Sequence, residues 1–147
     1  MDIATSRFGT LRIEGDDTLR FPNGILGMEE CREWVLVADA HNDSLGWLQS
    51  LSRPHVALAV VSPRRFVPDY QIRVARRELS PLHLDQLGDA QVLVAVSSHT
   101  HAVTLNLKAP LVLNLSKRLG CQVVAKDRHS LQYEIAAPNE DLLKKTA

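Results

Sequence analysis

Apolar and polar residues alternate with a period of two along most of this chain. In residues 10–13 and 18–21, the apolar side chains Leu11, Ile13, Leu19 and Phe21 alternate with polar ones. This period is typical of strands that bury one face. The acidic, glycine-containing segment 14–17 lies between the two stretches and predicts a β-hairpin at the N-terminus.

The same analysis predicts further strands through the rest of the chain. They are expected near residues 34–38, 47–50, 56–61, 70–74, 92–96, 103–107, 111–115, 123–125 and 131–135, with turns at 22–24, 119–120 and 127–130. Residues 56–61 differ from the others because six apolar residues follow one another between Pro54 and Pro63. A short valine-rich run of this kind predicts a strand buried on both faces.

Helical signals are few. Residues 80–88 predict a short helix, because Ser80 can cap it, Pro81 suits the first helical position and Gly88 suits the position after its end. A second segment, 27–33, is expected to form one or two helical turns, and Glu29 and Glu30 near its start favour the helix dipole.

About ten short strands and one or two short helices predict a mainly β protein. We expect a single-domain, antiparallel, β-barrel-like fold, with a sandwich as the related alternative. The domain is expected to span residues 1–138. Residues 139–147 are expected to form a C-terminal tail, either a short helix or a disordered end.

Composition narrows the functional classes. The 147 residues carry 17 Lys and Arg against 17 Asp and Glu, a formal net charge of zero. This balance argues against a broad nucleic-acid surface, which needs excess positive charge. The N-terminus has no apolar signal-peptide core, and no apolar run approaches the ~20 residues of a membrane helix. We therefore expect a cytoplasmic protein, in which free thiols at Cys31 and Cys121 are favoured over a disulfide.

No catalytic, metal-binding or cofactor-binding motif is recognisable. His99 and His101 have strand spacing and can in principle share a metal ion, but no neighbouring carboxylate or cysteine completes a site. Solvated loop histidines are the favoured interpretation. The sequence also lacks paired-cysteine, His-Glu-x-x-His, phosphate-loop and Gly-x-Ser-x-Gly motifs. We expect no catalytic residue, no metal and no cofactor.

The connector after the apolar run, residues 63–70, is the leading surface candidate. Arg64, Arg65 and Phe66 lie between two prolines, and arginine and aromatic residues are enriched at interface hot spots. The prolines stiffen the loop and reduce the entropy cost of binding. Core packing is the favoured interpretation for Phe66, and both interpretations stay open for the arginines. Asp69 and Tyr70 are candidates too, with turn capping and core packing as their structural alternatives.

Two asparagines, Asn106 and Asn114, flank the break at Ala109-Pro110. Proline cannot donate to a central ladder, so the break predicts a bend or an edge. The asparagines either bond the local backbone, which is the favoured interpretation, or line a surface groove.

Several segments together resemble one protein family. They are TSRFGTLRI (5–13), FPNGILGMEE (21–30), WLQS (47–50), VVSPRRFVPDY (60–70), NLKAPLVLN (106–114) and GCQVV (120–124). Their order and spacing, from about residue 5 to 133, resemble the FliW family of bacterial flagellar assembly factors. Met28 replaces a usual aromatic or leucine position. The turn 115–119 keeps part of the family's basic charge at Lys117 and Arg118, and Cys121 takes a usually polar position.

The resemblance implies a non-enzymatic cytoplasmic protein with two alternative partners. One is CsrA, a small dimeric RNA-binding repressor that FliW-like proteins bind away from its RNA surface, relieving repression of flagellin synthesis. The other is flagellin, which sequesters the protein until flagellin is exported. No direct nucleic-acid or membrane binding is expected. The candidate partner-binding residues are Arg64, Arg65, Phe66, Asp69, Tyr70, Asn106, Lys117 and Arg118. The alternative from another class is a small-molecule-binding β-barrel or barrel enzyme, which requires a pocket with converging polar groups.

Overall fold

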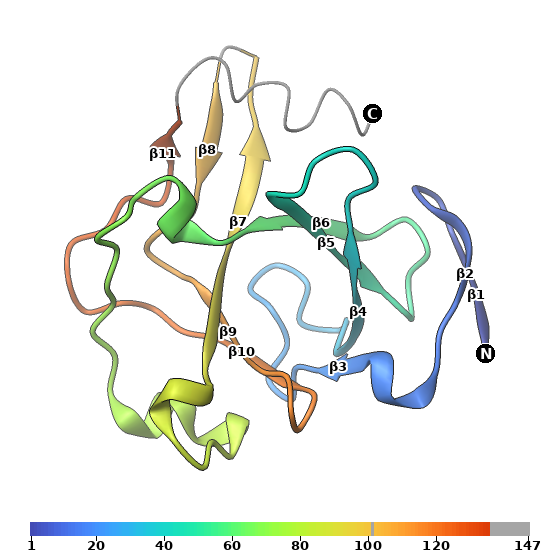
Figure 1. The fold of residues 1–147 in the computed structure, drawn as a ribbon, viewed down its shortest axis with the longest axis horizontal. Helices are drawn as coiled ribbons and strands as arrows, with labels where there is room; N and C mark the ends of the chain where they lie inside the picture. Colours follow the sequence, from blue (N-terminus) through green and yellow to red (C-terminus); the bar gives the residue numbers. More distant parts are fainter. Residues whose placement is uncertain (101, 136–147) are drawn as a thin grey trace.

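Seven strands close into a barrel in the computed structural model, which describes residues 1–100 and 102–135. The order is β7-β6-β5-β4-β3-β10-β9, and β9 pairs back onto β7. Neighbouring strands are antiparallel except β3 and β10, whose parallel pairing joins Arg20 to Leu119. Beyond the barrel, β7 continues into pairing with β8, and β8 pairs with β11 (Figure 1). The predicted mainly β, barrel-like fold is confirmed.

The described residues contain eleven strands and four short 3-10 helices. The strands are β1 (Asp2–Thr5), β2 (Gly9–Arg12), β3 (Thr18–Arg20), β4 (Glu33–Ala38), β5 (Leu45–Ser50), β6 (Ala57–Val61), β7 (Gln91–Ser98), β8 (Val103–Leu105), β9 (Leu111–Asn114), β10 (Leu119–Gln122) and β11 (Tyr133–Glu134). The helices are η1 (Gly15–Asp17), η2 (Pro63–Arg65), η3 (Arg76–Leu82) and η4 (Leu87–Asp89).

The barrel interior is filled by apolar side chains from the strands and from the loop between β3 and β4. This inner cluster consists of Leu19, Phe21, Ile25, Cys31, Trp34, Leu48, Val60, Leu93, Leu111 and Leu113. The buried indole of Trp34 is satisfied, because its Nε1 donates to the Cys31 carbonyl at 3.0 Å. The predicted turn at residues 22–24 is present, and Gly24 has a φ of 72° there. A Cβ at Gly24 would lie 2.7 Å from the Glu29 carbonyl oxygen, so this turn requires glycine.

Strand β6 separates the inner cluster from a second one. Val60 points inward, whereas Ala59 and Val61 belong to an outer cluster with Leu45, Trp47, Tyr70, Val94, Val96, Val103, Leu105 and Leu107. The prediction of a strand buried on both faces is therefore confirmed for this part of β6. A third cluster, formed by Leu82, Val112, Cys121 and Val123, lies between η3 and the outer face of β9 and β10. Both cysteines are free, as expected, and both are buried.

The predicted N-terminal hairpin is wrong in its pairing. Strand β2 pairs with β1, whereas β3 pairs with β4 and β10. Residues 15–17 form η1 and lead from one sheet into the other. The alternation correctly marks both strands. The partners of β3, however, are the next strand, β4, and the distant strand β10.

The predicted strand at 70–74 is absent. Its backbone bonds go to a distant loop: the Lys126 amide donates to the Arg73 carbonyl at 2.6 Å, and the Arg73 amide donates to Asp127 Oδ1 at 3.0 Å. Because the Asp127 side chain, and not a backbone carbonyl, accepts from the Arg73 amide, the two segments do not form a β-ladder. The predicted strand at 123–125 is likewise displaced, because a tight turn at 115–118 starts β10 at Leu119, where a turn was expected.

The predicted helix at 80–88 is also wrong. Helix η3 begins earlier, where the Ala75 amide donates to the Glu78 carboxylate at 3.1 Å, and Pro81 lies inside it. The helix ends at Leu82, because the next residue, His83, has a φ of 48° and leaves the helical conformation. Burial of Leu82 in the third cluster decides this placement over the capping signals. Residues 27–33 form turns and the start of β4 instead of helical turns. The tail, 139–147, lies outside the described residues.

Candidate partner-binding surface

The connector between β6 and residue 70 is held against the outer cluster by its own aromatic ring. Phe66 is half-buried and packs on that cluster, so the core-packing interpretation is confirmed. The Phe66 and Val67 amides both donate to the Pro63 carbonyl, at 3.1 and 2.8 Å. Pro63 is thus the first residue of η2, and the bonds to its carbonyl hold the backbone of Arg64 and Arg65 in this helical turn.

Both arginines of the connector are exposed, and each side chain makes one hydrogen bond within the described residues. The Arg64 Nε donates to the Tyr70 carbonyl at 3.1 Å, which braces the connector across its own length. The Arg65 Nη1 donates to Ser44 Oγ at 3.3 Å, which joins the connector to the loop between β4 and β5. Arg65 also borders a cavity of about 400 Å³ at the barrel mouth, which Leu36 and Asp43 line as well. Their guanidinium groups therefore lie on the surface in defined positions.

Tyr70 is a structural residue. Its ring is 4% exposed and its hydroxyl donates to the Leu107 carbonyl at 2.6 Å. Burial, helped by the negative charge of Asp127, raises the pKa of Tyr70 to about 12. The ring also contacts His129, with centroids 4.8 Å apart. Asp69, the predicted site residue next to Tyr70 in the chain, is exposed.

A loop from the far end of the chain holds the other side of Tyr70. His129 Nε2 lies 2.7 Å from the Gln71 carbonyl and 3.4 Å from Asp127 Oδ2. Burial disfavours the charged form of Asp127, but bonds from backbone amides and from His129 outweigh it and lower the pKa of this carboxyl. Contacts of the connector with residues 107 and 127–129 therefore fix its position.

Asn106 acts on its local backbone. Its Oδ1 accepts from the amides of Lys108 and Ala109 at 3.2 and 3.0 Å, which shapes the break before β9. Asn114 is buried, and its Nδ2 donates to the Leu82 carbonyl at 2.9 Å. Asn106 therefore follows the favoured interpretation of bonding to the local backbone. Asn114 does not, because its backbone partner is 32 residues away in η3.

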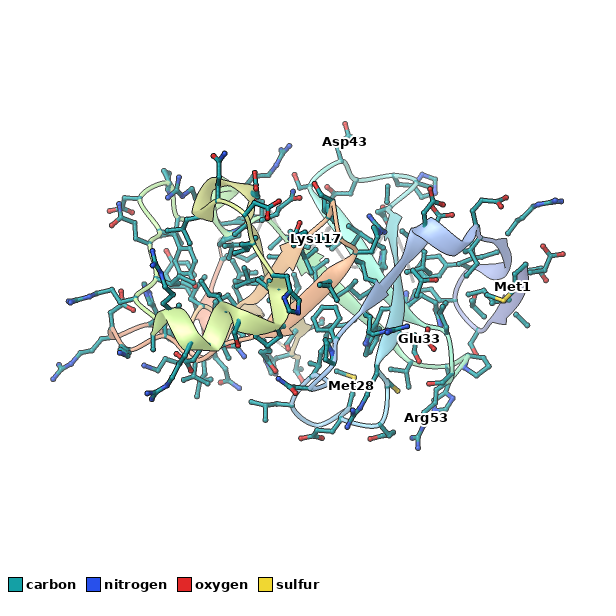
Figure 2. All side chains as sticks on the ribbon, turned by 90° about the horizontal axis from the view of Figure 1, so that it is seen from below. Met1, Met28, Glu33, Asp43, Arg53 and Lys117 are labelled. Atoms are coloured by element: carbon teal, nitrogen blue, oxygen red, sulfur yellow. The ribbon has the colours of Figure 1, made fainter. Side chains whose placement is uncertain are left out.

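Lys117 and Arg118 lie apart from the connector, in the turn between β9 and β10 (Figures 1 and 2). Lys117 Nζ donates to the His83 carbonyl and lies 3.2 Å from Asp85 Oδ1. Arg118 has a φ of 55°, and its Nη2 donates to the Asp17 carbonyl at 2.7 Å. The predicted site residues therefore form two groups, those of the connector and those of the turn between β9 and β10. Asn106, at the break before β9, belongs to neither segment.

One contact that the sequence analysis missed involves Trp47. The Arg7 guanidinium lies 4.2 Å from the centroid of the Trp47 ring, and Phe8 meets that ring edge-on at 6.0 Å. Trp47 Nε1 donates to Asp39 Oδ1 at 3.2 Å. The β1–β2 hairpin is thereby docked onto β5. No periodic signal links residues 7 and 47, since the contact depends on the closed barrel.

The histidines and the barrel interior bear on the metal-binding and small-molecule alternatives. Within residues 1–100 and 102–135, no group of three or more His, Cys, Asp or Glu side chains is placed to hold a metal ion. His99 Nε2 lies 3.1 Å from Thr104 Oγ1, whereas His101 lies outside the described residues. The apolar inner cluster occupies the barrel, so the small-molecule alternative has no support from an interior pocket. No helix in the described part of the chain is long and apolar enough to span a membrane.

The sequence was compared with protein families and with proteins of known function. Residues 2–137 match the family model described as FliW protein. The flagellar assembly factor FliW of Syntrophus aciditrophicus is 36% identical over 146 residues, covering 97% of this chain and 92% of that protein. The FliW of Bdellovibrio bacteriovorus is 34% identical over 131 residues, covering 88% of this chain and 75% of that protein.

A comparison of structures indicates the same family as these two relatives do. A crystal structure of the flagellar assembly factor FliW superimposes with a TM-score of 0.82 and 29% identity, covering 92% of this chain and 96% of that one. The family match spans the whole barrel and both groups of predicted site residues. This chain belongs to the FliW family of flagellar assembly factors.

Proposed function

We propose that this protein is a non-enzymatic partner switch in flagellar assembly. It binds the translational repressor CsrA and so relieves repression of flagellin synthesis, and cytoplasmic flagellin sequesters it. The observation that carries the proposal is the family match over residues 2–137. Binding of CsrA to this protein and to RNA is coupled, so each ligand weakens the other by the same factor.

The geometry of the connector supports a role in binding a protein partner. Arg64 and Arg65 are exposed, and the segment that carries them is held by Pro63, by Phe66 and by the buried Tyr70. A loop fixed before binding loses little entropy when a partner docks on it. We therefore place the first contact of the partner at this connector.

The experiment that tests the switch is a competition between the two partners. The purified full chain is mixed with CsrA and with flagellin from the same organism, and complexes are separated by size-exclusion chromatography. The proposal expects a complex with each protein and displacement of CsrA as flagellin is added. Absence of both complexes, or a stable ternary complex, contradicts it.

The connector itself is tested by the double variant R64E/R65E. Binding to at least one partner is expected to weaken by about tenfold, because exposed interface charges are reversed. Thermal stability should stay within about 0.5 kcal/mol, as for surface substitutions generally. The matched control is R12E/R20E, which changes the net charge equally at two exposed arginines in β2 and β3. Unchanged affinity of R64E/R65E for both partners removes the connector from the interface.

A further inference from the structure

A concentration of positive charge lies just beyond the connector. Two segments, residues 73–78 and 124–130, contain five of the chain's 17 Lys and Arg but two of its 17 Asp and Glu. The five cations are Arg73, Arg76, Arg77, Lys126 and Arg128, which we call the basic surface. These segments carry a formal charge of +3, so the remainder of this neutral chain carries −3.

The fold brings the two segments together although about fifty residues separate them. The Lys126 amide donates to the Arg73 carbonyl, and the Arg73 amide donates to Asp127 Oδ1. Figure 1 shows the green and orange-red segments side by side along one flank of the barrel. In Figure 2, long side chains that end in nitrogen project from this end of the molecule, opposite Met1.

The acids of these segments do not neutralise the cations locally. The Glu78 carboxylate accepts from the Ala75 amide, and the Asp127 carboxylate accepts from the Arg73 amide and contacts His129. All five cations of the basic surface are exposed. Within the described residues, none of the five takes part in an ion pair. Their charge is therefore directed to solvent.

A groove lined by leucines adjoins the basic surface. Leu79, Leu84 and Leu87 line it, and its volume is about 450 Å³. The polar lining consists of Arg76, Arg77, Ser80, His83 and Asp85. The Asp85 carboxylate, the one acid among them, is paired with Lys117 at 3.2 Å. Leu87 is 70% exposed, an unusual position for a large apolar side chain. Arginines that flank an apolar groove match a ligand with acidic and aliphatic side chains on one face.

We propose that the basic surface and the leucine groove together dock an acidic amphipathic helix of a protein partner. The leucines of such a helix enter the groove, and its carboxylates meet Arg76 and Arg77. A protein suits this site better than a nucleic acid, because the segments of the basic surface contain no Phe, Tyr or Trp on which bases can stack. The ring of their one histidine, His129, packs against Tyr70 instead. The surface is distinct from Arg64 and Arg65 and extends the proposed function.

Model peptides test this surface without reference to CsrA or flagellin. The probe is a fluorescein-labelled helical peptide of about 18 residues with Glu and Leu on one face, and its counterpart carries Lys in place of Glu. Fluorescence anisotropy measures binding to the full chain. We expect the Glu/Leu peptide to bind at least about tenfold more tightly than the Lys/Leu peptide, and to bind more weakly as salt rises from about 50 to 300 mM.

Variants assign the binding to the proposed residues. R76E/R77E should weaken binding of the Glu/Leu peptide by at least about tenfold, and L87S by about fivefold, since one removes charge attraction and the other apolar contact. R12E/R20E provides the matched charge control and should bind nearly as the wild type does. Thermal melts check the fold of each variant, and K126E/R128E replaces R76E/R77E if that variant unfolds.

Three outcomes overturn the proposal. They are failure of the Glu/Leu peptide to bind, an equal loss of affinity in R12E/R20E, and displacement of the peptide by a single-stranded RNA oligonucleotide that binds more tightly. A negative result here leaves the competition between CsrA and flagellin intact. Conversely, failure of that competition does not affect the peptide result.

Discussion

Gly120 in β10 offers a direct test of how the barrel is packed. A Cβ at this position would lie 2.5 Å from Cε1 and Cζ of Phe21 and 2.9 Å from its Cε2. Ordinary carbon contacts are about 3.5 Å or longer, so the Gly120→Ala substitution requires a displacement of about 1 Å. Phe21 is 0% exposed, and the inner cluster surrounds its ring within a closed sheet. The substitution therefore overpacks the core instead of moving a free side chain.

The magnitude follows from this geometry. Overpacking of a filled core costs about 2 to 3 kcal/mol, which for a chain of this size lowers Tm by about 5 to 10 °C. Phe21→Leu alone leaves a small cavity and costs about 1 to 2 kcal/mol. In the double variant the smaller side chain makes room for the new methyl group. We expect it to be about 1.5 kcal/mol more stable than the sum of the two single losses predicts.

The assay is urea unfolding of the wild type, both single variants and the double variant, followed by tryptophan fluorescence. The two tryptophans, Trp34 and Trp47, report on the inner and outer clusters respectively. A loss below about 0.5 kcal/mol for Gly120→Ala, or additive losses in the double variant, would refute the packing described for the barrel interior.

Two further predictions concern a titrating side chain and a strained turn. The pKa of Tyr70 is raised from 10.0 to about 12, so its stabilising contribution is complete below pH 10 and is lost as pH rises to 12. The loss amounts to about 2 to 3 kcal/mol, and Tyr70→Phe should abolish it in chemical unfolding at several pH values. Burial also raises the pKa of Cys121, from 9.0 to about 11, so this thiol likewise loses stabilising free energy as the pH rises. The comparison is therefore made in a Cys121→Ala background. Equal pH dependence with and without the tyrosine hydroxyl contradicts this. At Arg118, whose φ is 55°, Arg118→Ala loses the bond to the Asp17 carbonyl and keeps the left-handed conformation. Arg118→Gly relieves that conformation and should be about 1 kcal/mol more stable than the alanine variant in thermal melts, whereas the reverse order refutes the reasoning.

The fold explains why the predicted partner-binding residues have different roles. Arg64, Arg65 and Asp69 are exposed, while Phe66 and Tyr70 hold the connector on the outer cluster. One short loop therefore holds three exposed charged residues together with a half-buried and a buried ring, and so contains both roles. Substitutions at Tyr70 are therefore expected to act on partner binding through the position of the connector.

Local patterns in the sequence were sufficient for several features. The alternation marked most strands, the uninterrupted run before Pro63 indicated β6 with two buried faces, and the glycine at position 24 indicated its turn. These features depend on backbone preference and on side-chain polarity within a few residues, which a single sequence displays directly. The order of six short segments along the chain was also enough to indicate the family.

Tertiary structure decided what depends on distant residues. The alternation at residues 18–21 cannot show that β3 pairs in parallel with β10, and capping residues at 80–88 do not reveal that Leu82 is drawn into the third cluster. The basic surface has the same origin, because Arg73 and Lys126 become neighbours only when the chain closes around the barrel. Burial and hydrogen bonding across the closed sheet outweigh local preferences of a few tenths of a kcal/mol to about 1 kcal/mol, so strand partners, the role of Tyr70 and the charged surface belong to the fold as a whole.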